Sequence, residues 1–303
     1  MGFADDFYYG QCKVVATSTT TADNGKTVVV ASSGGRTWSG TMANKKCEFM
    51  LPPRDSYTLQ LMSGSTVQHT EKILVGYGEY VEVELGMDKT TALGIKAIVN
   101  AGLEATFFQA GDTVQVKENG TAAQYDVVEV DYRHAVYGHN IILQRHDCLN
   151  TTRQMQTSNT NVGGYNSTLI KTFLDGEFYD SLETDFQNAI SEYSYQGSVG
   201  NQSSNLQTET HKVFLPVEFN VFGATTYAAG TERTTGGAEQ WAYYATAANR
   251  VKAANGASCG WWLSSPQVSI ATSFCVVSAS GAANADSASN SHGVAPCFLI
   301  AAD

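Results

Sequence analysis

Residues 259–303 read CGWWLSSPQVSIATSFCVVSASGAANADSASNSHGVAPCFLIAAD, and this C-terminal stretch decides how the chain is interpreted. It contains two adjacent tryptophans, Trp261 and Trp262, and neither lysine nor arginine. Neighbouring residues of a strand face opposite sides, so one indole is expected in a core and the other in a second core layer or beside a surface groove. Small residues alternate with a sparse apolar frame in the rest of the stretch. Such a frame can hold a core while the residues between its members change.

Two motifs in this stretch resemble those of a known family. Trp261–Pro266 reads WWLSSP and is similar to a WWLRSP motif, and Gly293–Phe298 reads GVAPCF and is similar to GVAPGF. Upstream, NTTRQM from Asn150 and SNTNVGGYN from Ser158 also look familial. Over residues 90–300 the chain resembles the variable proteins of diversity-generating retroelements found in gut phages and bacteria. It departs from them at two motif positions, where serine replaces arginine (Ser264) and cysteine replaces glycine (Cys297).

The resemblance implies a C-type-lectin-like fold, similar to that of formylglycine-generating enzymes, with a diversified segment at residues 259–300. A rigid scaffold that carries changeable surface residues is how many recognition sites tolerate variation. The fixed structural frame would comprise Trp261, Trp262, Phe274, Gly281 and Phe298. The ligand-binding, variable positions between them would be Val268, Ile270, Ala271, Thr272, Val276, Ser278, Ser280, Ala282, Asn284, Ala285, Asp286, Ser287, Asn290 and His292.

The N-terminal part is predicted to be a small β-sandwich. Short alternating segments separated by turn signals such as Asp23-Asn24-Gly25 are typical of sandwiches. Leu51-Pro52-Pro53 followed by Ser56-Tyr57-Thr58-Leu59 is similar to a corner of immunoglobulin-like modules, although it has no glycine at the turn. The expected strands are Cys12–Ser18, Lys26–Ser32, Glu48–Leu51, Ser56–Met62, Val67–Val75 and Glu79–Leu85.

The composition changes after these strands, and a domain boundary is expected near Gly86–Lys89. Thr90–Gly102 has apolar residues at helical spacing and a glycine that can end the helix. We therefore predict an α+β chain with an immunoglobulin-like sandwich at residues 1–87 and a C-type-lectin-like domain at residues 88–303. Within the second domain the pattern predicts strands at Thr113–Lys117, Asp126–Val130 and Ile141–Gln144 and a loop at Gly197–Thr210. It also predicts a long helix that is capped by Asn166 or Ser167, runs to about Ser191 and has a break or kink at Gly176. A short helix is expected at Glu239–Ala254.

The charge argues against nucleic-acid binding. The net charge is −11, and the sequence contains no cluster of lysine and arginine. A nucleic-acid binder needs cationic side chains to displace counterions from phosphates. Residues 1–13 have neither the basic nor the apolar region of a signal peptide, and the chain lacks the run of about 18 apolar residues that a membrane span needs. We expect neither a nucleic-acid partner nor membrane insertion.

Signals for catalysis or metal binding are weak. His134, His139 and His146 are close in sequence, but their separations match no familiar zinc spacing. Six cysteines form no CxxC pair, and Cys148, Cys259, Cys275 and Cys297 carry no nucleophile signature with His211 or His292. Two groups of carboxylates are interpreted as solvent-exposed faces and not as catalytic pairs: Glu82 with Glu84, and Asp180 with Glu183 and Asp185. We therefore expect no enzyme activity, catalytic residue, metal or cofactor. The sequence contains no acidic cluster with the spacing of a calcium-binding loop, and it leaves open whether calcium is bound.

The sequence, together with the resemblance, predicts a receptor-binding protein with a hypervariable recognition surface. The favoured interpretation is a phage tail-fibre component, made in the host cytoplasm, carried on the virion and directed at a protein or glycan of the bacterial surface. The N-terminal domain would then connect to other tail proteins, and phage relatives suggest a homotrimer. The alternatives are a bacterial surface adhesin and an enzyme on a formylglycine-generating-enzyme-like fold. The variable positions lack tyrosine, tryptophan and arginine, which dominate binding hot spots, so weak monovalent affinity strengthened by multivalency is expected.

Overall fold

The computed structural model describes residues 11–18, 21–85 and 88–303. The chain divides into two compact units, residues 1–98 and 99–303. The boundary was expected near Gly86–Lys89, of which residues 86 and 87 lie outside the described residues. The observed division lies within helix α1 (Ala92–Asn100). This helix is the one that the Thr90–Gly102 pattern predicts, and Gly102 adopts a φ of +66° directly after it.

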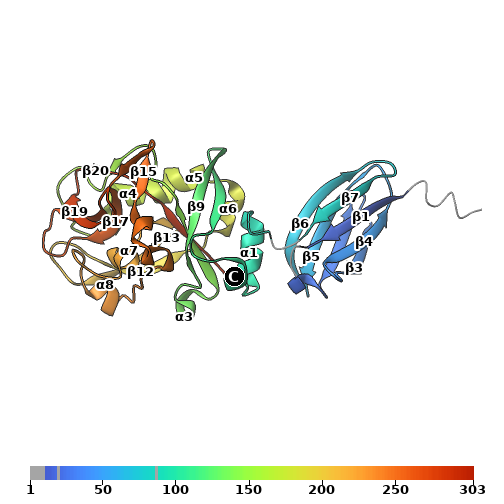
Figure 1. Ribbon diagram of the computed structural model, residues 1–303, viewed down its shortest axis with the longest axis horizontal. Helices are drawn as coiled ribbons and strands as arrows, with labels where there is room; N and C mark the ends of the chain where they lie inside the picture. The colour runs from blue at the N-terminus through green and yellow to red at the C-terminus, as the bar shows by residue number, and fades with distance from the viewer. Residues whose placement is uncertain (1–10, 19–20, 86–87) are drawn as a thin grey trace, which may run out of the picture. The chain divides into compact units, whose positions relative to one another are not determined.

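The first unit consists of two sheets that enclose one apolar core (Figure 1). One sheet has the order β4-β1-β7 and the other β3-β2-β5-β6. Alternation produces the core: in β5 the buried side chains are Tyr57, Leu59 and Leu61, and their neighbours face outward. The elements are β1 (Cys12–Thr17), the 3-10 turn η1 (Thr21–Asp23), β2 (Thr27–Ser32), β3 (Thr37–Thr41), β4 (Lys46–Leu51), β5 (Asp55–Ser63), β6 (Thr66–Val75) and β7 (Tyr80–Glu84).

All six strands expected in this unit are present, with small differences at their ends. The sequence reading missed β3, which lies at the edge of its sheet and pairs only with β2. Its residues are only half-buried or exposed, so it lacks the apolar alternation that marks the other strands. Trp38 is its one large side chain, and it packs against the edge of the Tyr57 ring at 5.8 Å between centroids.

A five-stranded sheet with the order β14-β21-β10-β9-β8 runs through the second unit. The last strand, β21, pairs with both β10 and β14, so the C-terminal segment returns to the interior of the sheet. The elements up to β14 are α1, α2 (Glu104–Phe107), β8 (Thr113–Glu118), β9 (Thr121–Val130), α3 (His134–Tyr137), β10 (Asn140–Arg145), β11 (Arg153–Gln154), η2 (Tyr165–Ser167), α4 (Leu169–Phe173), the π-turn η3 (Leu174–Phe178), α5 (Tyr179–Ser181), α6 (Thr184–Ala189), β12 (Tyr193–Ser198), β13 (Leu206–His211) and β14 (Val213–Phe214).

The remaining elements lead into and include the C-terminal stretch of residues 259–303. They are α7 (Glu218–Phe222), α8 (Thr231–Thr234), the 3-10 turns η4 (Ala242–Ala245) and η5 (Ala247–Arg250), β15 (Lys252–Ala254), β16 (Ala257–Cys259), β17 (Trp261–Pro266), β18 (Ser273–Val277), β19 (Ala283–Ser287), β20 (Ser291–His292) and β21 (Cys297–Ala301). In Figure 1, β17, β19 and β20 gather at one end of the second unit, whereas α6 and β9 lie toward the other end.

Three predictions for this unit are corrected. The expected long helix is capped by Thr168, whose hydroxyl accepts from the Lys171 N–H, and not by Asn166 or Ser167. The irregularity expected at Gly176 is present as the π-helix η3, but extended backbone at Leu182 ends the helix before α6. The short helix expected at Glu239–Ala254 is instead two 3-10 turns and strand β15. The loop expected at Gly197–Thr210 is largely the β12–β13 hairpin, whose polar alternation hid it in the sequence.

The molecule is therefore a β-rich α+β protein, as expected at that level of description. The core of the second unit joins aromatic residues from several segments, among them Phe214, Trp241, Tyr244 and Trp261. Among the described residues no helix is long and apolar enough to cross a membrane.

Candidate functional site

The C-terminal segment forms a three-stranded antiparallel sheet, β17-β18-β19. Every residue of β17 and β18 is buried, whereas β19 lies at the sheet edge and has only half-buried and exposed residues. Two turns join these strands, at residues 267–272 and 278–282. The segment thus combines two interior strands with an accessible edge and two accessible turns.

The predicted frame residues lie in the interior. Trp261, Trp262, Phe274 and Phe298 have no exposed surface. Both indole N–H groups donate to backbone carbonyls, Trp261 to Arg250 at 2.9 Å and Trp262 to Arg153 at 2.8 Å. Each tryptophan is therefore buried with its polar atom satisfied, which favours core packing of both over a groove.

Gly281 has a structural reason to be glycine. Its φ is +83°, and a Cβ there would lie 3.1 Å from a methyl of Val251. Residues with a side chain rarely adopt this backbone conformation, and the nearby Val251 also leaves little room for a Cβ. Gly281 thereby fixes the turn that presents Ser278, Ser280 and Ala282.

The predicted variable positions are mostly accessible. Val276, with 1% exposure, is the exception and cannot belong to an exposed binding surface. It lies on β18, which the interior covers on both faces. The half-buried positions are Val268, Ala271, Thr272, Ser278, Ala285, Asp286, Ser287 and His292, and the exposed ones are Ile270, Ser280, Ala282, Asn284 and Asn290.

A buried asparagine holds the β17–β18 turn. The Asn161 side-chain amide donates to the carbonyls of Gln267 (3.2 Å), Ile270 (2.9 Å) and Ser273 (2.8 Å). Its carbonyl oxygen accepts from the backbone N–H of Asn201 at 2.8 Å. With no exposed surface, Asn161 fixes the turn that presents Val268–Thr272. Asn161 lies in the SNTNVGGYN segment, but nothing in the sequence pattern indicated this role.

Gly200 permits this arrangement. Its φ is +69°, and a Cβ there would lie 1.8 Å from the Asn161 carbonyl oxygen. The two backbone segments therefore approach more closely than any side chain at residue 200 would allow.

The edge strand carries a small polar network. Asp286 accepts from Asn290 at 2.8 Å and contacts His292 Nε2 at 2.7 Å. Burial alone would raise the pKa of Asp286, but the hydrogen bonds from His292, the Ser287 N–H and Asn290 outweigh it and hold the pKa below its usual value. His292 also packs edge-on against the Trp262 ring at 4.7 Å between centroids. This part of the surface is thus polar and held together by hydrogen bonds.

Buried carboxylates lie beneath β17. Ser265 donates to Glu232 at 2.6 Å and accepts from the backbone N–H of Glu218 at 2.9 Å. Burial raises the pKa of Glu232 to about 8, although the bonds from Ser265 and the Ser198 N–H oppose the shift. Burial also raises the pKa of Glu218. Since Glu232 has 1% exposure, it supports the sheet from inside and does not meet a ligand.

The structure brings two cysteines together that the sequence could not pair. Cys148 and Cys259 are in hydrogen-bond contact, which is the main cause that raises the pKa of Cys148, together with burial, and lowers that of Cys259. Cys148 has 1% exposure, and Cys259 is half-buried. Cys275 and Cys297 are buried, and burial raises both of their pKa values.

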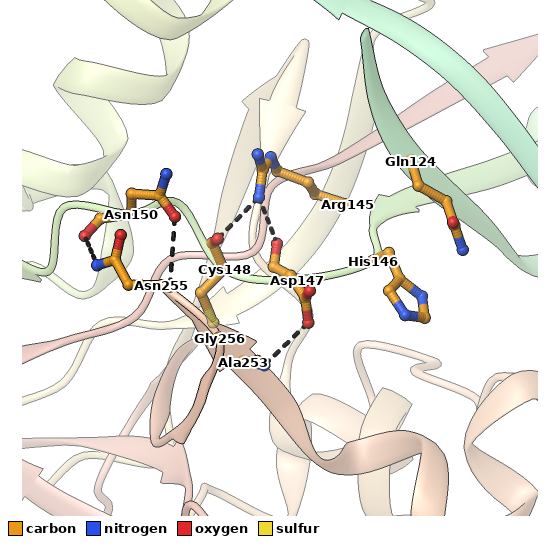
Figure 2. Close-up of a pocket in the computed structure, with 9 residues that line it drawn as sticks. All are labelled: Gln124, Arg145, His146, Asp147, Cys148, Asn150, Ala253, Asn255 and Gly256. Atoms are coloured by element: carbon orange, nitrogen blue, oxygen red, sulfur yellow. Dashed lines mark hydrogen bonds between the residues drawn. The ribbon is translucent and has the colours of Figure 1, made fainter.

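Cys148 also lines a shallow polar hollow of about 260 Å³ (Figure 2). Figure 2 shows Asn150 and Asn255 facing each other, and the Arg145 guanidinium donating to the carbonyls of Asp147 and Cys148. Small-molecule sites are usually larger and mostly apolar, at about 300–1,000 Å³. This hollow therefore gives little support to a small-molecule pocket.

The three histidines of the His134–His146 stretch separate into two places. His134 and His139 lie together with Asp131 in the β9–β10 connection. His146 lies in the hollow of Figure 2 and contacts Asp126 at 2.9 Å. Of the other candidate bases, His211 is buried beside Asp175, and His292 lies on the edge network.

Comparison with known proteins gives a family for the second unit. Residues 138–302, more than half of the chain, match a family described as a domain of unknown function, DUF6273. The chain belongs to the DUF6273 family. The DUF6273 match contains every predicted variable and frame position, together with Asn161, Cys148 and Cys259. It begins after His134 and ends just before the C-terminal residue.

The other comparisons add little to the family. No curated protein matches this DUF6273 chain. A solved structure, a leucine-rich repeat protein from Bacteroides thetaiotaomicron, is 14% identical, with 46% of this chain and 22% of that chain covered and a TM-score of 0.19. This chain thus spans less than a quarter of that protein, and a score so low carries no argument.

Proposed function

We propose that this protein is a ligand-binding protein whose recognition surface is formed by the β17–β18 turn, the β18–β19 turn and the edge strand β19. One observation carries the proposal: within residues 261–298 the expected frame is buried, and the expected variable positions, Val276 apart, are half-buried or exposed. Such a division lets surface side chains change without loss of the core.

The proposal includes the family resemblance seen in the sequence. The second unit would be a C-type-lectin-like domain of a retroelement-diversified variable protein, and the first unit an immunoglobulin-like connector. The two-sheet core of the first unit is compatible with that role, because such modules commonly act as spacers. In this proposal the protein is a phage tail-fibre component that binds a protein or glycan of the bacterial surface, and the alternative is a bacterial surface adhesin. A homotrimer would supply multivalency.

The first test is to sequence this locus in a clonal population propagated with its retroelement. Variation is expected at the accessible positions, with Trp261, Phe274, Phe298 and the buried Val276 constant. A uniform sequence, while a marked template elsewhere is shown to be copied and mutated, would contradict a diversified surface.

The second test measures binding by the full chain. Fixed bacterial cells and an array of bacterial surface polysaccharides serve as probes, with the protein displayed multivalently. A variant with Ile270, Asn284 and Asn290 each changed to alanine is expected to lose binding. The matched control changes the exposed Thr113, Gln115 and Lys117 of β8 to alanine, and should bind like the original chain. Equal binding by both variants would refute the proposed surface.

One observation favours an enzyme as the second candidate. The Cys148–Cys259 contact is the kind of thiol pair that redox chemistry on a formylglycine-generating-enzyme-like fold would need. Neither cysteine is one of the proposed recognition positions, so the two roles can be tested separately. Substituting Cys259 with serine should leave ligand binding unchanged, whereas an enzyme would lose turnover of a thiol substrate such as a cysteine-containing peptide.

A further inference from the structure

The connection between β9 and β10 gathers two imidazoles and a carboxylate. Asp131, His134 and His139 each offer one ligand atom, and these atoms all lie within 4.8 Å of one another. The two imidazole rings meet edge to face, with centroids 4.6 Å apart. All three side chains reach solvent, with exposures of 38%, 52% and 44%. An ion from solution therefore has access to them.

The backbone of this connection is held in a definite shape. Asp131 and Arg133 adopt left-handed conformations, with φ values of 57° and 44°, which are uncommon for residues other than glycine. The buried Asn140 stabilises them, since its amide donates to the carbonyls of Tyr132 (2.8 Å) and Gly138 (2.7 Å). Strained backbone that its surroundings maintain is often found where side chains must be positioned.

A buried carboxylate behind His139 is a second, independent feature. Glu104, with 2% exposure, contacts Nδ1 of His139 through Oε1 at 2.7 Å. Its other oxygen, Oε2, is buried with no hydrogen-bond partner among the described residues. Metal-binding histidines usually donate their second ring N–H to such a carboxylate, which fixes the tautomer and the ring orientation. In the neutral tautomer whose Nδ1–H donates to Glu104, Nε2 of His139 carries the lone pair.

Residue 102 keeps that nitrogen uncovered. A Cβ at Gly102 would lie 2.8 Å from His139 Nε2, so any other residue would obstruct it. The same glycine, with its positive φ, also ends α1. The geometry therefore leaves the lone pair of His139 free to bind.

We propose that Asp131, His134 and His139 bind one divalent transition-metal ion, with Zn²⁺ as the reference ion, and that Glu104 is the residue that positions His139. Imidazole nitrogen and carboxylate oxygen are established zinc ligands, at about 2.0–2.2 Å. His134 Nδ1 and Asp131 Oδ1 are 2.6 Å apart in this structure, so this contact would open by about 0.7 Å for both to reach the tetrahedral spacing that those bond lengths imply. Their exposure allows that movement.

Three protein ligands leave a fourth position open to water or to an oxygen of a partner. A bound dication would also offset the two carboxylates gathered here, in a chain whose net charge is −11. This site is independent of the proposed recognition surface: α3, which begins at His134, lies well apart from β19 and β20 in Figure 1.

The test is calorimetric titration of the full chain with ZnCl₂ at pH 7.5 after removal of metals by a chelator. We expect one Zn²⁺ per chain. His134→Gln and His139→Gln should each weaken binding by about 100-fold or more, and Glu104→Gln by about 10- to 100-fold. The matched control is His146→Gln, since His146 is similarly exposed, at 47%, and lies outside the cluster. It should bind Zn²⁺ like the original chain.

The thiols of Cys148 and Cys259 require their own control, because cysteine also binds zinc. The titration is repeated in the Cys148→Ser, Cys259→Ser background, and Co²⁺ replaces Zn²⁺ to reveal thiolate ligation by its near-ultraviolet charge-transfer absorption. Zinc binding should persist, and the cobalt spectrum should show only nitrogen and oxygen ligands. Binding lost in the serine background, or kept in both histidine variants, would overturn the proposal.

Thermal unfolding separates a lost ligand from a lost fold. Without zinc, His134→Gln should unfold at the temperature of the original chain, and His139→Gln somewhat lower, because it removes the partner of the buried Glu104. With zinc, only the original chain and His146→Gln should be stabilised, because an ion that binds the folded state alone raises its unfolding temperature. No zinc-dependent shift in the original chain would contradict the proposed site.

Discussion

The two units bury their strands in different ways. In the first unit a strand such as β4 alternates strictly, with every second residue exposed. In the β17-β18-β19 sheet of the second unit, β17 and β18 are buried throughout, and accessible residues are confined to β19 and the turns. A strand with one solvated face tolerates change at every second position, whereas a fully buried strand tolerates little. Variation in this sheet must therefore be placed at its edge strand and turns.

The largest effect should separate the tryptophans of the two units. Trp262→Ala removes a fully buried indole and leaves the Arg153 carbonyl without its donor, so we expect the second unit to lose about 5 kcal/mol. Trp38→Ala in the edge strand β3 removes a half-buried side chain and should cost about 1–2 kcal/mol in the first unit. Urea unfolding followed by hydrogen exchange assigns each loss to its unit. Equal losses would contradict the contrast.

The buried carboxylate beneath β17 should make the second unit sensitive to pH. The folded-state pKa of Glu232 is about 8, above its ordinary 4.5, so the folded protein holds the proton more tightly than the unfolded chain. The stability that this group contributes is therefore fully present below about pH 4.5 and is lost as the pH rises through about 8. At about 1.4 kcal/mol per pKa unit, the difference between 4.5 and about 8 makes the loss roughly 5 kcal/mol.

Glu232→Gln, which resembles the protonated form, should make the decline in stability between pH 5 and pH 9 shallower. Glu218 has a pKa raised in the same direction, so part of the slope should remain. The control is Glu192→Gln at an exposed site, which should keep the original slope. Urea unfolding at pH 5, 7 and 9 measures all three. A slope unchanged by Glu232→Gln would show that another group titrates.

The turn that Asn161 holds offers a more local comparison. Asn161→Ala removes a side-chain donor from the carbonyls of Gln267, Ile270 and Ser273, of which Ser273 keeps the Gln267 N–H, and should cost about 2–3 kcal/mol. Hydrogen exchange at residues 267–273 should become faster at the same time. Asn159→Ala, two residues away and exposed, should change neither quantity appreciably. Unchanged exchange in the Asn161 variant would mean that the turn is ordered by other contacts.

Local patterns predicted what local physics controls. Six strands of the first unit and the helix before Gly102 follow from alternation and helical spacing, which are properties of short windows. Strand β3 and the β12–β13 hairpin were missed because few of their side chains are apolar. The helix expected after Ser167 runs to Ser181 through the π-helical segment at Gly176, and extended backbone at Leu182 and Glu183 separates it from α6.

The site depended more on contacts between distant segments. The alternation of frame and intervening residues could be seen in the sequence, but not that Val276 faces inward. Asn161 reaches a turn more than 100 residues away, and Cys148 meets Cys259 across a similar separation. The sequence spacing of His134 and His139 indicated no metal site, because their approach depends on the left-handed backbone at Asp131 and Arg133. No periodicity encodes these contacts.

The smallest predicted effect tests the boundary between frame and surface at a single pair of residues. Val276 on β18 and Asn284 on β19 are directly opposite each other in the sheet register. Val276 has 1% exposure, whereas Asn284 is exposed. Val276→Ala should cost about 1–2 kcal/mol through the lost methyl groups and the cavity that remains, while Asn284→Ala should stay within about 0.5 kcal/mol. Ligand binding should respond in the opposite order, with the Asn284 variant weakened and the Val276 variant nearly unchanged at a temperature where both are folded. If the Val276 variant instead lost binding at full stability, the recognition surface would have to include the interior strand, and burial would no longer separate the residues that hold the fold from those free to vary.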